Sequence, residues 1–283
     1  MNTQDPCPTL GFFDSGVGGL SVWREVSRCL PQLPTLYVAD NAHIPYGPRP
    51  SAEIRAFAYG ITRFLIGRGA RLIVVACNTA SAAALTSLRA AFDIPFVGME
   101  PAVKPAAANT QTRHIGVLAT QGTLDGELFR STTQRYAQDV AVHVQVGDGL
   151  VDLVEAGQID HPRTEALLRR YLQPMLEAQV DHIVLGCTHY SFLLPVIRRL
   201  VPSEVTIVDP AYAVARQVQR LVTERFVTEN ILPEVTEDRL PISARFFVSD
   251  RSDILCALLR PYLDAPPQLE RLRWQHGDLV EDG

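Results

Sequence analysis

The sequence predicts an α/β fold made of two pseudo-symmetric domains, each built on an open parallel sheet, with the active site in the cleft between them. Apolar segments typical of strands alternate with helical segments, which indicates a mostly parallel sheet covered by helices. Two segments also recur. The run IVVACNTAS at 73–81 resembles IVLGCTH at 183–189, and GFFDS at 11–15 resembles GVLAT at 116–120. The recurrence indicates one α/β unit used twice.

In the first part of the chain, each expected strand is a short apolar run that ends at a polar or glycine-containing turn. A proline- and glycine-rich loop at 43–48 precedes Ser51, which we expect to cap a helix. The expected strands lie at 9–13, 36–39, 73–76 and 96–99, and the helices at 20–29, after residue 51, at 80–89 and after residue 101.

The rest of the chain continues the same alternation. The expected strands lie at 115–119, 140–146, 183–186, 205–208 and 245–248. The expected helices lie at 124–136, 150–155, 162–179, 192–200, 211–226 and 253–263. Proline at 162 suits a first helical turn. The tail beyond residue 266 is polar, and no element is expected there.

Domain boundaries follow from the two places where the chain passes between the repeated units, near residues 101 and 211. We expect a discontinuous first domain, 1–101 plus 212–283, and a second domain, 102–211. An eight-fold barrel is the alternative for such alternation, but the repeated cysteine segment favours two open sheets.

Composition excludes several classes of function. The net charge of −5 gives no basic surface for nucleic acid. No apolar run approaches the roughly 20 residues of a membrane span, and the polar start of the chain is no secretory signal. An odd number of cysteines, five, indicates free thiols in a reducing cytoplasm. Their spacing does not match a metal site, so we expect no metal.

The two repeated cysteines are the strongest candidates for chemistry. Cys77 and Cys187 each follow a predicted strand directly, at the edge of a parallel sheet where ligands bind. Asn78 and Thr79 are good N-cap residues, and a helix N-terminus favours a thiolate. A lone cysteine is commonly a small buried hydrophobe, which is the interpretation for Cys7, Cys29 and Cys256. Two thiols facing one cleft suit removal of a proton from one side of a carbon and its return on the other.

Other candidates are weaker when taken singly. Asp14 and Ser15 end a strand, where they either cap the next helix or orient a base and bind a substrate oxygen. His189 could tune the Cys187 thiol or relay a proton. Tyr46 and Gly47 form either a pocket wall or simply a turn. The weakest candidates, which could support the site from behind, are Asp40, Thr120 and Glu155.

Taken together, these residues resemble the cofactor-independent aspartate/glutamate racemase family, and within it the glutamate enzymes. The matching segments are FDSGVGGL at 13–20, PYG at 45–47, ACNTAS at 76–81, MEP at 99–101, ATQGT at 119–123, LVE at 153–155 and LGCTHY at 185–190. They cover roughly residues 10–215. The chain departs from the family at Gly147 and Asp148, where the family often has Cys-Pro, and at Ser191, where proline is usual.

The resemblance implies interconversion of L- and D-glutamate, supplying D-glutamate for bacterial peptidoglycan, with Cys77 and Cys187 as the two bases and Asp14 and His189 assisting them. It implies no cofactor, a cytoplasmic location, and leaves a homodimer open. The implied substrate contacts are Asp14, Ser15, Tyr46, Gly47, Asn78, Thr79, Thr188 and His189. The alternatives are racemisation of aspartate or another acidic amino acid, and a non-catalytic amino-acid-binding or regulatory protein.

Overall fold

Seven strands form the first of two sheets in this computed structural model, which describes residues 8–226, 244–263 and 265–282. Their order is β11-β10-β9-β2-β1-β3-β4, and all neighbours are parallel except β10 and β11. The strands are β1 (Thr9–Asp14), β2 (Thr35–Ala39), β3 (Ala70–Val75), β4 (Phe96–Gly98), β9 (Ala244–Val248), β10 (Leu269–Gln275) and β11 (Asp278–Glu281). The sheet therefore combines strands from both ends of the chain.

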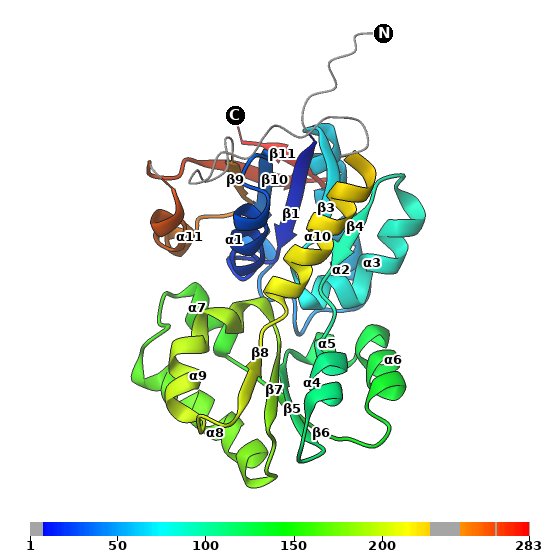
Figure 1. Cartoon of the computed structure of the whole chain (residues 1–283). Helices are drawn as coiled ribbons and strands as arrows, with labels where there is room; N and C mark the ends of the chain where they lie inside the picture. The colour runs from blue at the N-terminus through cyan, green and yellow to red at the C-terminus, as the bar shows by residue number, and fades with distance from the viewer. Residues whose placement is uncertain (1–7, 227–243, 264, 283) are drawn as a thin grey trace.

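Four parallel strands form the second sheet, in the order β6-β5-β7-β8. They are β5 (His114–Ala119), β6 (Ala141–Val146), β7 (His182–Gly186) and β8 (Thr206–Val208). Figure 1 shows the two sheets in separate lobes, stacked one above the other, with the first sheet in the upper lobe. The carboxyl ends of β1 and β3 face the lower lobe, and those of β5 and β7 face the upper lobe.

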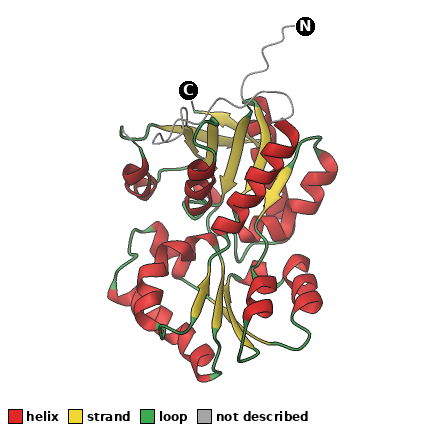
Figure 2. Ribbon diagram, viewed as in Figure 1, coloured by secondary structure: helices red, strands yellow, loops and turns green. Residues whose placement is uncertain are grey.

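Helices cover both sheets, as Figure 2 shows. Those of the first lobe are α1 (Leu20–Cys29), α2 (Ser51–Gly67), α3 (Asn78–Ala91), α10 (Ala211–Phe226) and α11 (Asp253–Leu259), with 3-10 turns η1 (Asn41–His43) and η4 (Arg260–Tyr262). Those of the second are α4 (Val103–Asn109), α5 (Gln121–Leu124), α6 (Glu127–Tyr136), α7 (Leu150–Glu155), α8 (Pro162–Glu177) and α9 (Leu194–Leu200), with the 3-10 helix η2 (Thr188–Leu193). Helix α10 packs against α1, so the chain returns to the first lobe there.

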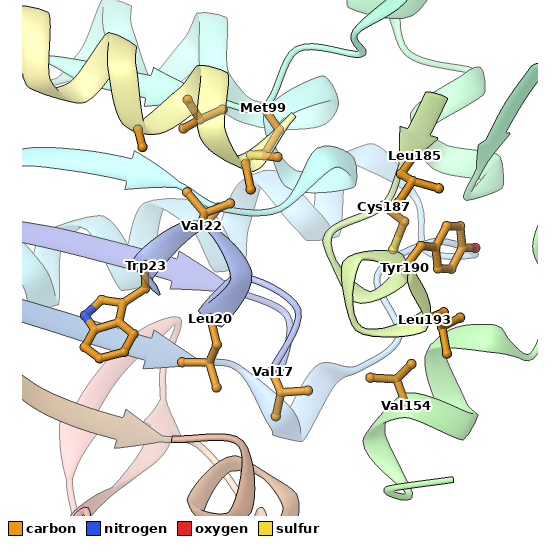
Figure 3. Packing of buried hydrophobic residues seen from close by; sticks show 14 of the residues in the cluster. Val17, Leu20, Val22, Trp23, Met99, Val154, Leu185, Cys187, Tyr190 and Leu193 are labelled. Atoms are coloured by element: carbon orange, nitrogen blue, oxygen red, sulfur yellow. The ribbon is translucent and has the colours of Figure 1, made fainter. Parts of the chain in front are cut away.

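The largest hydrophobic core runs through both lobes. Val17 and Leu20 from the first lobe belong to the same buried cluster as Val154 and Leu193 from the second, and Figure 3 shows them around the junction. Burial of apolar surface stabilises by about 25 cal/mol per Å², so this continuous cluster holds the lobes together beside Cys187.

The predicted fold class is confirmed, and the barrel alternative is wrong because two separate sheets form. We propose that the domain boundaries lie at 101/102 and 211/212, as expected from the sequence, because strands β5 to β8 all fall between them. The polar tail, where the sequence predicts no element, forms β10 and β11. Ser51 does not cap α2: it is the first helical residue, with Pro50 at the N-cap.

Candidate active site

Cys77 and Cys187 line one cavity of about 180 Å³ between the lobes, which we call the interlobe cavity. Each cysteine follows the strand that pairs with the first strand of its unit, β3 beside β1 and β7 beside β5. The equivalent positions predicted from the repeated sequence are therefore real. The wall includes the predicted residues Ser15, Tyr46, Gly47, Cys77, Asn78, Thr79, Thr120, Cys187, Thr188 and His189.

Cys77 is itself the N-cap of α3, which corrects the expectation that Asn78 or Thr79 caps this helix. Its Sγ accepts a hydrogen bond from Ala80 N at 3.4 Å. Burial raises the pKa of the Cys77 thiol well above its usual value, and the nearby carboxylate of Asp14 raises it further. The hydrogen bond from Ala80 lowers this pKa, but burial outweighs it. At neutral pH, Cys77 is therefore a thiol.

Asp14 lies behind the cavity wall and is fully buried. Its Oδ1 accepts from Gly16 N at 2.7 Å, and its Oδ2 accepts from the Thr188 hydroxyl at 3.0 Å. The second bond joins the two lobes. Burial raises the pKa of the Asp14 carboxyl, whereas the positive charge of His189 and both hydrogen bonds oppose that rise. The sequence predicts Asp14 on the Cys77 side of the cavity, and the charge of Asp14 does act on the Cys77 thiol.

Cys187 has a basic neighbour instead. Its Sγ lies 3.8 Å from His189 Nδ1, and His189 Nε2 lies 2.7 Å from Glu155 Oε1. Burial lowers the pKa of His189, but its hydrogen bonds with Cys187 and Glu155 and the charge of Asp14 outweigh burial and raise this pKa well above its usual value. His189 is therefore an imidazolium at neutral pH, with one N–H toward the sulfur and one toward Glu155.

Glu155 also ties the lobes together. The same oxygen that binds His189 accepts a hydrogen bond from Val17 N at 2.7 Å. Glycine at 16 and 18 permits this close approach, since a Cβ at Gly16 would overlap Glu155 and one at Gly18 would overlap His189. Glu155 is among the weakest candidates predicted from the sequence, because nothing local predicts this contact across 138 residues of chain.

Neutral polar groups line the α3 side of the cavity. Thr79 Oγ1 and Thr120 Oγ1 lie 2.9 Å apart and join the lobes. Both amide atoms of Asn78 are buried and have no hydrogen-bond partner in the described part of the chain. An unpaired buried amide is costly, so the Asn78 side chain is suited to receive a polar ligand.

The loop of residues 45–48 forms another part of the wall, and we call it the pocket loop. Tyr46 is buried, and its hydroxyl donates to Asp40 Oδ2 at 2.6 Å. Gly47 O accepts from Gly122 N of the second lobe at 3.2 Å. Asp40 is outside the cavity lining and contacts it through Tyr46.

Several wall residues were not expected from the sequence: Pro45, Pro48, Gln121, Gly147, Asp148, Gly149, Val151 and Asp152. Asp148 and Asp152 are exposed carboxylates at the second-lobe side. The only sequence feature that marked any of these wall residues is the departure from the family pattern at Gly147 and Asp148. No lysine or arginine is among the described residues of the wall, so carboxylate groups of a ligand would meet neutral donors and His189.

The remaining cysteines lie elsewhere. Cys29 and Cys256 are free, half-buried and outside the cavity wall, and Cys7 falls outside the described residues. Across residues 8–226 and the later described segments, no cluster of three or more His, Cys, Asp or Glu side chains could hold a metal. None of the helices in the described regions is both long and apolar enough to cross a bilayer.

Comparison with known proteins agrees with this geometry. The family model for Asp/Glu/Hydantoin racemase matches residues 19–218. Glutamate racemase of Roseiflexus sp. (strain RS-1) is 50% identical over 232 residues, which cover 82% of this chain and 85% of the relative. Glutamate racemase of Pseudomonas aeruginosa is 48% identical over 82% of this chain and 92% of its own length.

Solved structures extend the likeness to nearly the whole chain. Escherichia coli glutamate racemase, crystallised with L-glutamate and the activator UDP-MurNAc-Ala, superposes with a TM-score of 0.81 at 33% identity, covering 95% of this chain and 99% of that one. Glutamate racemase of Bacillus anthracis gives a TM-score of 0.80 at 29% identity, covering 96% and 98%. This chain, whose cavity presents two thiols from matching strand ends, therefore belongs to the Asp/Glu/Hydantoin racemase family and is an enzyme of the isomerase class.

Proposed function

We propose that this protein is a glutamate racemase, which interconverts L- and D-glutamate by a cofactor-independent mechanism with Cys77 and Cys187 as the two bases. The observation that carries the proposal is the pair of cysteines in one buried cavity, one beside a carboxylate and the other beside an imidazolium. The named relatives and the L-glutamate bound to the E. coli structure support the choice of substrate. The product D-glutamate would serve peptidoglycan synthesis.

The cavity suits an amino acid with two carboxylates. Its volume of about 180 Å³ is small, and its neutral donors include Ser15, Asn78, Thr79 and Thr188. Fixing the substrate at several points would hold the Cα–H bond between the two sulfur atoms, which supplies the positioning part of the rate enhancement. The protonated His189 supplies positive charge near the carbanion.

In one direction, the Cys187 thiolate, stabilised by His189, takes the proton from Cα, and the bonding electron pair stays on the substrate. The Cys77 thiol then donates its proton to the opposite face of Cα, which leaves a Cys77 thiolate and a Cys187 thiol. Atoms and charge balance, and the stereochemistry is inverted. The reverse reaction starts from that second protonation state, and Asp14 would then assist the return of a proton to Cys77.

Two other functions remain as alternatives. Aspartate or another acidic amino acid could replace glutamate in the same mechanism. A non-catalytic amino-acid-binding or regulatory protein would need a cavity but not two thiols. The cysteine pair favours an enzyme over the second alternative, and the glutamate racemase relatives favour glutamate over aspartate.

Circular dichroism of the purified protein with L-glutamate, and separately with D-glutamate, in D₂O without added cofactor tests the proposal. We expect both signals to decay to zero and deuterium to enter at Cα. Turnover of aspartate but not glutamate would keep the mechanism and change the substrate. Binding of acidic amino acids without any exchange would favour the binding-protein alternative.

A further inference from the structure

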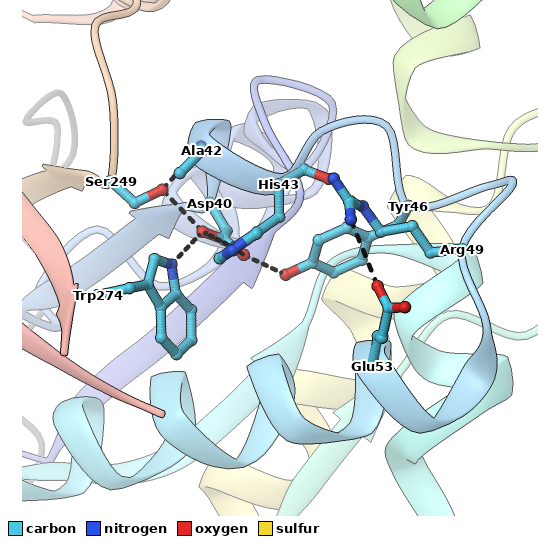
Figure 4. Close-up of polar contacts among 8 residues, drawn as sticks. All are labelled: Asp40, Ala42, His43, Tyr46, Arg49, Glu53, Ser249 and Trp274. Carbon is cyan, nitrogen blue, oxygen red and sulfur yellow. Dashed lines mark hydrogen bonds and ion pairs between the residues drawn. The ribbon is translucent and has the colours of Figure 1, made fainter. Parts of the chain in front are cut away.

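The carboxylate of Asp40, at the end of β2, is fully buried and has a full set of hydrogen-bond partners. Tyr46 Oη donates to Oδ2 at 2.6 Å, and Ser249 Oγ and Trp274 Nε1 each donate to Oδ1 at 2.7 Å. His43 Nδ1 lies 2.9 Å from Oδ2. Figure 4 shows these side chains converging on Asp40. We call these five residues the Asp40 cluster.

Two of these partners come from the C-terminal part of the chain. Ser249 follows β9, and Trp274 lies on β10, which forms an antiparallel hairpin with β11. The hairpin is held against α2, since Arg63 Nε donates to Asp278 Oδ1 at 2.6 Å and its Nη2 donates to Gly277 O at 3.1 Å. The position of Trp274 is therefore fixed independently of the cavity.

Aromatic contacts further restrict the Trp274 side chain. Its ring centroid lies 5.5 Å from that of Phe57 and 5.2 Å from that of His43, which itself stacks on Phe57 at 3.8 Å. An indole packed against two rings delivers its N–H to Asp40 with little loss of conformational freedom.

On the other side of Asp40, Tyr46 belongs to the pocket loop that lines the interlobe cavity. Its hydroxyl is donated to Asp40, so Tyr46 presents its ring and backbone rather than its hydroxyl to the cavity. The next residue, Gly47, bonds through its carbonyl to Gly122 of the second lobe. A shift of Tyr46 would therefore move a wall of the cavity and a contact between the lobes.

The energetics make each donor important. Asp40 has no lysine or arginine partner among the described residues, so its charge depends on neutral donors and on His43. A buried carboxylate that loses one donor is left partly unsatisfied, which is costly in a medium of low dielectric constant. The remaining donors would have to rearrange, and Tyr46 is the one that faces the cavity.

We propose that Trp274 is a positioning residue of the active site: through Asp40, its indole N–H holds Tyr46 and the pocket loop in the arrangement that receives substrate. This deepens the proposed racemase function, on which the kinetic test rests. The C-terminal hairpin thereby contributes to substrate binding without touching the substrate.

The test is Trp274→Phe, which removes the N–H and keeps an aromatic ring against His43 and Phe57. We expect KM for L- and D-glutamate to rise about three- to tenfold, the value of one ordinary hydrogen bond, with kcat nearly unchanged because ground state and transition state use the same wall. The matched control is Trp23→Phe, which removes the indole bond to Thr35 in the core, at 3.0 Å, and should leave KM unchanged. An unchanged KM in Trp274→Phe would overturn the inference.

A double-mutant cycle with Tyr46→Phe separates positioning from general loss of stability. Because both hydroxyl and indole act on one carboxylate, the combined rise in KM should be smaller than the product of the two single effects. Multiplicative effects would contradict a shared role. If Trp274→Phe does not fold, Ser249→Ala removes another donor to the same Asp40 oxygen and carries the same expectation.

A binding measurement distinguishes failure of this inference from failure of the racemase proposal. Calorimetric titration with D-glutamate measures the dissociation constant without turnover. We expect Kd to rise about three- to tenfold in Trp274→Phe and to stay unchanged in Trp23→Phe, whether or not racemisation occurs. An unchanged Kd in Trp274→Phe would overturn the inference, whereas a raised Kd in a protein that shows no turnover would overturn only the racemase proposal.

Discussion

The two cysteines occupy the same position in two similar units, yet their surroundings are opposite. Cys77 caps an α-helix, accepts a hydrogen bond from Ala80 and faces the buried carboxylate of Asp14. Cys187 precedes a 3-10 helix, receives no capping hydrogen bond on its side chain, and lies beside the imidazolium of His189. The repeated backbone brings both sulfur atoms to one cavity, and each sulfur atom meets a different partner there.

A duplicated unit therefore gives both cysteines the same position in the fold but not the same electrostatic surroundings. A two-base mechanism needs one protonated and one deprotonated base at the start of each turnover. Two identical environments would favour the same protonation state in both cysteines. The acidic partner on one side and the basic partner on the other remove that problem.

The largest effect on activity is expected from replacing either Cys77 or Cys187. Cys77→Ser and Cys187→Ser should each lower the racemisation rate by roughly a thousandfold, because serine is a far weaker acid and base at neutral pH. Each variant should still exchange the Cα proton of one enantiomer with D₂O, and the two variants should exchange opposite enantiomers, measured by NMR. Cys29→Ser and Cys256→Ser are the controls outside the cavity, and full activity in either cavity variant would disprove the two-base mechanism.

A smaller loss is expected when only the partners are changed. Asp14→Asn and His189→Asn should each lower kcat by about a hundredfold. Because the enantiomers have equal free energy in water, kcat/KM must stay equal in the two directions. The difference between the Cys77 side and the Cys187 side should therefore appear in the Cα-deuterium isotope effect on kcat. We expect this isotope effect to increase for one enantiomer in Asp14→Asn and for the other enantiomer in His189→Asn. The same pattern in both variants would mean that the partners do not divide between the cysteines.

The charge on His189 should also appear in the pH dependence of stability. Its pKa is raised in the folded protein, so its contribution is complete below the unfolded value of about 6.5 and is lost as pH rises through the folded value. Wild type should lose up to about 1.4 kcal/mol of unfolding free energy per pH unit in this window, measured by urea titration. His189→Asn should lack this slope, while His276→Asn, at an exposed turn, should retain it. Equal slopes in wild type and His189→Asn would show that His189 is not held charged.

The smallest effect on activity is expected from the exposed carboxylates at the second-lobe side of the cavity wall. Asp148 and Asp152 place negative charge on the second-lobe side, where an anionic substrate enters. Replacing both by asparagine should raise kcat/KM for glutamate about twofold at low ionic strength, and salt should abolish the difference by screening. The control is Asp139→Asn, because Asp139 is exposed and lies outside the cavity wall. A gain that persists in high salt would indicate a change of shape instead.

Much of the fold could be predicted because the strands of parallel sheets are apolar and end at recognisable turns. The hairpin of β10 and β11 could not, because these strands lie at the edge of the sheet and bury little more than Leu272 and Leu279. Such a strand shows no continuous apolar run. Its importance comes from one indole that reaches Asp40, a contact across 234 residues.

The candidate site divides in the same way. Cys77, Cys187 and His189 were found from local sequence because strand ends and repeated segments mark them. Nothing local shows that Glu155 bonds both His189 and Val17, or that Asp148 and Asp152 reach the cavity. These placements arise only when the two lobes meet.

The order of the strands also has a consequence for synthesis on the ribosome. All strands of the second sheet lie within residues 114–208, whereas β9, at residues 244–248, pairs with β2 in the first sheet. The second lobe can thus form during translation while the first lobe still lacks three strands. A nascent chain that ends before Ser249 offers Asp40 neither that hydroxyl nor the indole of Trp274, so the active site is among the last parts of the molecule to be completed.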